Sequence, residues 1–209
     1  IVQATAGLEY KDESGVIDES FCDIFGVLVD RDDWTLGEEV VNDEYYPNGF
    51  LRSLEEPKLG DQPDNYNDVI YLGTDIDNGG VHINSGIPNK AFYIIASSIG
   101  KDKAEQIYYR ALTTYLTRSS DFLDLRIGLE ERAIDIYGSN SAELISVKEG
   151  LDAVGILFEE VESASKIEVD GTDYILSYDT DPSNQTTFYI SDPFAEEFVA
   201  ISETEIVTK

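Results

Sequence analysis

Asp77-Asn78-Gly79-Gly80-Val81-His82-Ile83-Asn84-Ser85-Gly86 contains the single histidine of this 209-residue chain. The adjacent glycines Gly79 and Gly80 allow the backbone before His82 to turn sharply and to approach a ligand closely. The carboxylate of Asp77 can reach one imidazole nitrogen and fix which nitrogen carries the proton. A lone histidine is more often a surface or satisfied core residue, so the residue type alone does not establish a site.

The same stretch, continued by Ile87-Pro88-Asn89-Lys90-Ala91, resembles the active-site segment of the thermolysin-like neutral metalloproteases. The resemblance implies that His82 stabilises the transition state and that Asp77 orients it. It further implies a zinc-dependent endopeptidase that is secreted and acts on protein or peptide substrates. The resemblance covers residues 1–157, which we expect to form this family's C-terminal helical domain.

Residues 14–30 have the apolar spacing of a helix that packs against a core. The stripe consists of Ile17, Phe21, Ile24, Phe25 and Leu28. Glu19 and Asp23 lie four residues apart and share another face of this helix. On pattern alone, such a pair indicates a solvated acidic face more often than a metal site.

Tyr10 and residues 13–26 are similar to the segment of the same family that carries its third zinc ligand. This resemblance implies that Glu19 binds zinc and that Asp23 holds a zinc-binding histidine in place without touching the metal. It also implies that Tyr10 donates a hydrogen bond to the transition-state oxyanion. A catalytic zinc commonly takes two histidines and a glutamate and keeps one position open for water.

The family's H-E-x-x-H helix supplies two zinc ligands and the general base, and the match to residues 1–8 places that motif just before Ile1. The chain has no methionine and begins Ile1-Val2-Gln3, so we expect it to be a piece of a larger protein. With one histidine, this piece cannot complete a two-His-one-Glu site. We therefore expect it to be inactive without the missing N-terminal half of the protease.

An acidic stretch follows the first helix: Asp30, Asp32, Asp33, Glu38 and Glu39 surround Trp34 and Gly37. Hard carboxylate oxygens in a turn-rich loop suit calcium, although a loop of mutually repelling acids is an equally good interpretation. The equivalent loop of the family binds structural calcium, which favours Asp30, Asp33 and Glu38 as ligands. Here the loop is shorter and carries Thr35 in place of one acid, so the resemblance does not extend to two ions.

Leu51-Arg52-Ser53-Leu54, followed by Pro57, resembles the family's substrate-binding segment. The resemblance implies that Arg52 contacts the substrate backbone and that Leu51 lines the pocket for the residue after the cleaved bond. Without it, an arginine in so acidic a chain is interpreted as a salt-bridge partner. The polar residues 60–71 indicate a connection without regular structure.

From Ser85 onward the apolar spacing is helical in four successive segments, which predicts a helix bundle. The stripes begin at Ala91, Ala104, Phe122 and Leu144, and the last two end before Gly138 and Gly155. β-branched and aromatic runs then predict strands at 166–169, 174–178, 188–190 and 198–201. The predicted fold is thus mainly α, with a short β-rich extension over 158–209.

The composition excludes some partners. Fourteen basic residues against 43 acidic ones give a formal charge of −29, which argues against nucleic acid and anionic membrane surfaces and favours cations. Most of the acid is expected simply to solvate the surface. The single cysteine, Cys22, cannot form an internal disulfide, and its place in an apolar helix pattern predicts a buried filler of the core.

Two further hypotheses remain open. The chain could be a non-catalytic, acidic, calcium-binding module that keeps the protease fold, or an incomplete gene product without a function of its own. The sequence upstream of Ile1 distinguishes the enzyme from the module, because only the enzyme needs H-E-x-x-H.

Overall fold

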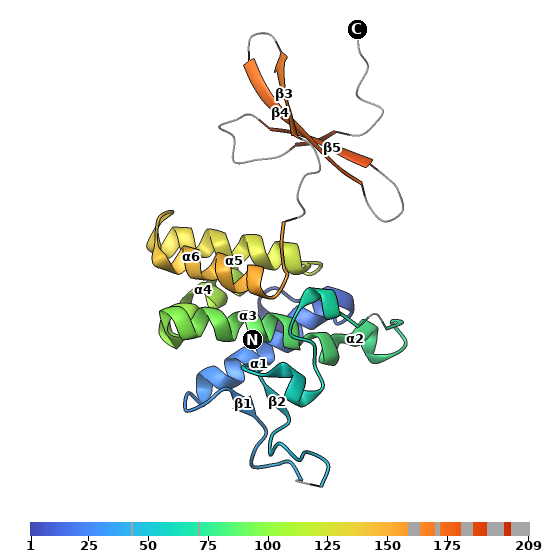
Figure 1. Ribbon diagram of the computed structural model, residues 1–209, viewed down its shortest axis with the longest axis vertical. Coiled ribbons are helices and arrows are strands. Elements are labelled where there is room, and N and C mark those ends of the chain that lie inside the picture. The colour runs from blue at the N-terminus through green and yellow to red at the C-terminus, as the bar shows by residue number, and fades with distance from the viewer. Residues whose placement is uncertain are drawn as a thin grey trace. The chain divides into compact units, whose positions relative to one another are not determined.

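The structure is a computed structural model that describes residues 1–42, 44–70, 72–158, 164–169, 172–180, 186–191 and 199–201 (Figure 1). The chain divides into two compact units, Ile1–Leu157 and Phe158–Lys209. The first unit is mainly helical, as predicted, and holds every candidate site residue. None of the helices in the described part of the chain combines the length and apolar character needed to cross a bilayer.

Helix α1 spans Asp12–Val29 and begins two residues before the predicted start. The apolar stripe forms the core as expected, since Ile17, Phe21 and Ile24 are almost completely buried. Cys22, however, is exposed, so its interpretation as core filler is wrong. It lies one position beyond Phe21 and therefore turns off the buried stripe onto the face of Glu19.

The remaining helices of the first unit are α2 (Asp77–Asn84), α3 (Gly86–Ile99), α4 (Lys101–Thr114), α5 (Phe122–Tyr137) and α6 (Ala142–Ala153). The predicted bundle is confirmed: α3 packs against α1, α4 and α6, and α5 packs against α4 and α6. Side-chain caps mark two helix starts, with Asp121 accepting from the backbone of Asp124 and Ser141 from that of Leu144. The bundle forms one core continuous with α1.

Helix α2 is bent at its start and pressed against α1. Its first residues Asp77–Gly80 all have positive φ, between 49° and 91°, a conformation that glycine adopts readily and other residues avoid. A Cβ on Gly15 of α1 would lie 2.5 Å from the Cγ1 of Val81. The absence of a side chain at Gly15 thus lets α1 approach the turn that carries His82.

Between α1 and α2 the chain is more ordered than predicted. Strands β1 (Thr35–Leu36) and β2 (Arg52–Ser53) pair antiparallel, with Thr35 opposite Ser53. Two 3-10 helices follow, η2 (Pro57–Gly60) and η3 (Tyr66–Asp68), and a third, η1 (Val2–Ala4), opens the chain. The described residues 61–70 are irregular, as expected, apart from η3, which Asn65 caps by accepting from the backbone of Asn67.

In the second unit the described strands are β3 (Ala164–Val169), β4 (Thr172–Thr180), β5 (Thr186–Ser191) and β6 (Val199–Ile201). They form an antiparallel sheet in chain order, with Val169 opposite Thr172 and Thr180 opposite Thr186. The predicted strands are confirmed, except that the predicted start of the last one, Phe198, lies outside the described residues.

Candidate functional site

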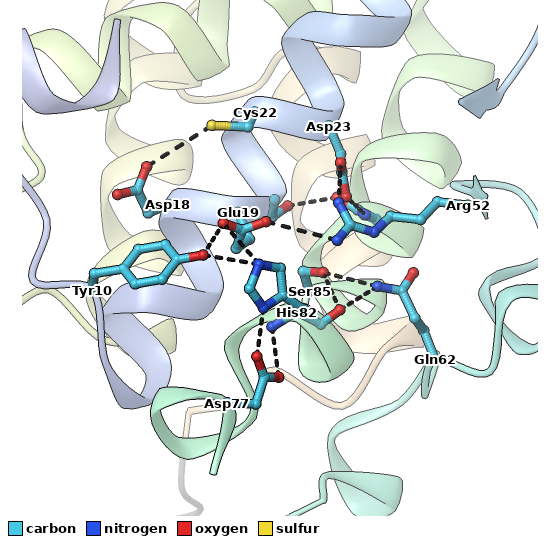
Figure 2. A network of polar contacts seen from close by, with 12 residues as sticks. Tyr10, Asp18, Glu19, Cys22, Asp23, Arg52, Gln62, Asp77, His82 and Ser85 are labelled. Atoms are coloured by element: carbon cyan, nitrogen blue, oxygen red, sulfur yellow. Dashed lines mark hydrogen bonds and ion pairs between the residues drawn. The ribbon is translucent and has the colours of Figure 1, made fainter. Parts of the chain in front are cut away.

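The imidazole of His82 is held by one carboxylate (Figure 2). Nδ1 lies 2.5 Å from Asp77 Oδ1, and the backbone N–H of His82 donates to Asp77 Oδ2 at 3.1 Å. Because a carboxylate only accepts, Nδ1 carries a proton and Nε2 is the ring nitrogen that faces the rest of the site. The positive φ angles of Asp77–Gly80 fold the chain back so that the aspartate reaches both groups.

Two side chains meet this nitrogen: Tyr10, which precedes α1, and Glu19, from the middle of α1. Tyr10 Oη lies 3.0 Å from His82 Nε2 and donates a hydrogen bond to Glu19 Oε1, which is itself 3.6 Å from Nε2. Burial raises the pKa of the Tyr10 hydroxyl, and the neighbouring Glu19 raises it further. Tyr10 therefore keeps its proton near neutral pH and acts as a donor.

Arg52 joins Glu19 to a second carboxylate on the same helix. Its Nη1 lies 2.7 Å from Asp23 Oδ1, and its Nη2 lies 3.8 Å from Glu19 Oε2. The other oxygen of Asp23 accepts from Asn89 Nδ2 at 2.8 Å, and Ser20 donates to the amide oxygen of Asn89. Burial raises the pKa of Asp23, and Arg52 and Asn89 offset part of that rise.

We refer to Tyr10, Glu19, Asp23, Arg52, Asp77 and His82 as the Glu19 cluster. The structure brings together six of the residues that the sequence singled out. Arg52 forms the ion pairs expected of an arginine in an acidic chain. Leu51 stands directly before β2, is 39% exposed, and packs against Gly37.

An open hollow begins beside the cluster. Its volume is about 590 Å³, and its lining is mostly polar, formed by Gln3, Gly7, Leu8, Glu9, Tyr10, Lys11, Thr74, Asn78 and Arg118. Tyr10 is thus reached from solvent through this hollow.

We refer to residues 30–39 as the acidic loop. Its carboxylates bind the backbone of the loop itself: Asp33 Oδ1 accepts from Thr35 N at 2.9 Å, and Asp30 Oδ1 accepts from Asp32 N at 3.4 Å. Within the described residues, no three His, Cys, Asp or Glu side chains are grouped so that they could hold a metal ion. The structure therefore does not bring Asp30, Asp33 and Glu38 together, and calcium binding there stays a prediction.

A lysine that the sequence did not single out holds the acidic loop. Lys101 Nζ donates to the backbone oxygens of Asp33 at 2.7 Å, Arg31 at 3.1 Å and Val27 at 3.4 Å. The ammonium also lies 4.0 Å from the centroid of the Trp34 ring, a cation–π contact. Burial lowers the pKa of Lys101, and Asp33 offsets part of that effect.

Zinc fits the Glu19 cluster only in part. Glu19 supplies a carboxylate oxygen that faces an imidazole and a phenol, which is a suitable donor for zinc. A catalytic zinc takes three protein ligands, and the described residues offer no group of three.

Sequence reasoning missed the residues that support the cluster from behind, namely Gly15, Ser20, Gln62, Ser85 and Asn89. The signal for Gly15 was a small residue within an apolar helix pattern, which marks a close approach of another element. Gln62 and Asn89 bond to residues from 20 to 66 positions away, and no local pattern reports such contacts.

Comparison with known proteins shows which proteins this chain resembles. A family model described as the thermolysin metallopeptidase alpha-helical domain matches residues 6–156. The chain is 48% identical over 159 residues to an extracellular elastase of Staphylococcus epidermidis, a match that covers 75% of this chain and 30% of that protein. It is also 48% identical over 158 residues to bacillolysin of Bacillus amyloliquefaciens, covering 75% and 29%.

A solved structure, the precursor of protealysin, a metalloproteinase from Serratia proteamaculans, superposes with a TM-score of 0.64 at 31% identity. That match covers 75% of this chain and 54% of the other. The chain spans about 30% of the length of the two curated relatives.

Proposed function

Because this chain belongs to the thermolysin family of metallopeptidases and forms its alpha-helical domain, we propose that it is the part of a secreted zinc endopeptidase that contributes Glu19 and His82 to the active site. The peptide bond of a protein or peptide is the proposed substrate. The remaining zinc ligands and the general base would come from an H-E-x-x-H segment, which these 209 residues do not contain.

One observation carries the proposal: Tyr10 Oη, Glu19 Oε1 and His82 Nε2 converge within 3.6 Å of one another. In the proposed site Glu19 is the metal ligand, while Tyr10 and His82 are hydrogen-bond donors on either side of it. When bound, zinc would supply a Lewis acid and an activated water. The chain's own part is to hold one ligand and two donors at a fixed separation.

Asp77 is proposed to set the orientation and protonation of His82. With Asp77 accepting from Nδ1, the second proton of the imidazolium lies on Nε2 and points to the place where negative charge develops on the substrate oxygen. Tyr10, whose pKa is raised by burial, remains a neutral second donor at that place.

Arg52 is proposed to neutralise the carboxylates behind the metal and to present its guanidinium to the substrate backbone. Its ion pairs with Asp23 and Glu19 fix the guanidinium, and its side chain remains 18% exposed. Asp23 keeps free lone pairs after binding Arg52 and Asn89, because a carboxylate has about four acceptor positions. Asp23 can therefore also hold a histidine that binds the metal.

The test uses the completed enzyme, in which the 209-residue chain is joined to an upstream segment containing an H-E-x-x-H helix from a thermolysin-family peptidase. His82→Ala is expected to lower kcat roughly a hundred- to thousandfold, since one such donor is worth about 2.7–4 kcal/mol in the transition state. KM should change little. Asp77→Asn should cost less, because it disturbs orientation while leaving the donor in place.

Arg31→Met serves as the control, because Arg31 pairs with Asp102 and Glu105 on the surface. A completed enzyme that cleaves peptides equally well with and without His82 would overturn the proposed role. The 209-residue chain alone should show no chelator-sensitive peptidase activity and only weak zinc binding that Glu19→Gln leaves unchanged. Stoichiometric zinc binding lost in Glu19→Gln would show that the chain completes the site by itself.

A further inference from the structure

The segment Pro57–Pro63 is seated directly against the turn between α2 and α3. A Cβ on Gly86, the first residue of α3, would lie 2.5 Å from Pro63 O and 2.7 Å from Gln62 Cβ. No side chain fits at such separations, so the contact exists because residue 86 is glycine. The close approach brings Gln62, which is 5% exposed, beneath the turn that carries His82.

The amide nitrogen of Gln62 binds this turn at two points (Figure 2). Gln62 Nε2 donates to the backbone oxygen of His82 at 2.6 Å and contacts Ser85 Oγ at 2.9 Å. Ser85 Oγ in turn donates to the same backbone oxygen at 3.0 Å. Three polar groups therefore close a buried triangle on the carbonyl of His82.

Gln62 and Asp77 hold His82 from its two sides. Asp77 accepts from the backbone N–H and from Nδ1, while Gln62 and Ser85 donate to the backbone oxygen. The four residues before Val81 have positive φ, which is an unfavourable conformation for Asp77 and Asn78. A turn built on such backbone requires contacts from outside itself to keep one position.

The oxygen of the Gln62 amide is in a different situation from its nitrogen. Gln62 Oε1 is buried and has no hydrogen-bond partner among the described residues, and a buried oxygen in that state costs stability. A methionine would fill the same space without this cost. The advantage of an amide at residue 62 thus lies in the two contacts that Nε2 makes with the His82 turn.

We propose that Gln62 is a positioning residue for His82, which fixes the imidazole by bonding to the backbone that carries it. The inference rests on the proposed role of His82 as a transition-state donor. Gln62 touches neither substrate nor metal in this scheme. Its removal should displace the donor, and a displacement of about 1 Å can cost as much as roughly a hundredfold in rate.

The first test uses the 209-residue chain and its single imidazole, whose nuclear magnetic resonance signals need no assignment. In the wild type we expect one set of ring signals, with Nδ1 protonated and held by Asp77. Gln62→Met should shift and broaden these signals while the circular dichroism of the helices is retained. Gln3→Met is the matched control, because the amide of Gln3 donates to Asp18 and Leu8 instead.

The second test uses the completed enzyme in a double-mutant cycle. Gln62→Met should lower kcat about tenfold or more with little change in KM, and should have no further effect when His82→Ala is already present. Ser85→Ala removes two contacts of the triangle but leaves the bond from Gln62 Nε2 to the backbone oxygen of His82. It should therefore give a smaller loss of the same kind, and it serves if Gln62→Met does not fold.

The outcomes separate the inference from the proposed function. If His82→Ala lowers kcat but Gln62→Met and Ser85→Ala behave like Gln3→Met, the positioning role is wrong and the function stands. If His82→Ala has no effect on kcat, the proposed function fails first. A loss from Gln62→Met that is undiminished by His82→Ala would show that Gln62 acts on the fold and not through the imidazole.

Discussion

The Glu19 cluster and the acidic loop, which follows the end of α1, both gather carboxylates, but their charges are balanced in different ways. In the cluster, carboxylates contact side chains: Asp23 and Glu19 meet Arg52, and Asp77 meets His82. In the acidic loop, carboxylates bind the loop's own backbone, and the cation Lys101 binds backbone oxygens. The cluster thus holds reactive groups in place, whereas the loop holds the shape of a chain segment.

The largest expected effect on stability is that of removing Arg52 from the cluster, which we compare with removing Arg31 from the acidic loop. Arg52→Met should lower the free energy of unfolding by about 3–5 kcal/mol, because it leaves Asp23 as a buried charge without its ion pair. Arg31→Met, within the acidic loop, should cost less than about 1 kcal/mol, since its partner Asp102 is 89% exposed. Urea unfolding followed by circular dichroism measures both.

Equal losses of unfolding free energy in Arg52→Met and Arg31→Met would contradict the comparison. They would mean that the ion pair of Arg52 is no more desolvated than a surface pair. Acidification gives a second check on the same variant. Burial raises the pKa of Asp23, so Asp23 is neutralised early as the pH falls, and the cost of Arg52→Met should shrink accordingly.

Much of the Glu19 cluster was predictable because its members sit in two short continuous motifs. Glu19 and Asp23 share a helix face by their spacing of four, and Asp77 precedes His82 across two glycines. The resemblance to a known family then gave these positions their roles. Arg52 was harder to interpret, because its sequence context fits a salt bridge and a substrate contact equally well.

The acidic loop was predicted less well, because its structure depends on a residue about 70 positions away. Lys101 Nζ contacts Asp33 O across a separation of 68 residues, and nothing near residue 101 indicates that partner. The number of carboxylates in the sequence gives the charge of the acidic loop, but it does not give the directions in which their oxygens point. The helices α4 to α6 needed no distant information, because their apolar spacing and caps are local.

The second prediction concerns Lys101. Lys101→Met should lower the free energy of unfolding by about 2 kcal/mol, since it leaves three backbone oxygens without a charged donor and removes a cation–π contact. For a chain of this size, that corresponds to a fall in Tm of roughly 4–8 °C. Fluorescence of Trp34, the only tryptophan, reports the acidic loop directly.

Thermal unfolding of the wild type and of Lys101→Met, each with calcium and with a chelator, shows whether Lys101 or calcium stabilises the acidic loop. We expect the change caused by Lys101→Met to exceed the change caused by the chelator, because the ammonium already binds the carbonyls of the loop. Lys103→Met is the matched control, since Lys103 pairs with Glu143 on another helix. A chelator effect larger than that of Lys101→Met would favour calcium at Asp30, Asp33 and Glu38.

The smallest expected effect concerns Asp18, a buried carboxylate beside the cluster that accepts a hydrogen bond from the amide of Gln3 and not from an arginine. Asp18 is 6% exposed and accepts from Gln3 Nε2 at 3.0 Å. Burial raises the pKa of Asp18, and the Gln3 amide offsets part of that rise. Asp18→Asn should therefore raise Tm at pH 7 by a few degrees at most, because an amide accepts the same hydrogen bond without a buried charge.

The sign of the pH dependence follows from the raised pKa of Asp18. The stability contributed by its protonated form is complete below the ordinary value of 3.8 and is lost as the pH rises through the folded-state value. Asparagine resembles the protonated form at every pH, so the advantage of Asp18→Asn should disappear below pH 3.8. Asp102→Asn, at a carboxylate that is 89% exposed, should show no comparable gain at pH 7. A gain from Asp18→Asn that persists unchanged in acid would mean that packing, rather than the buried charge, distinguishes this carboxylate from those of the acidic loop.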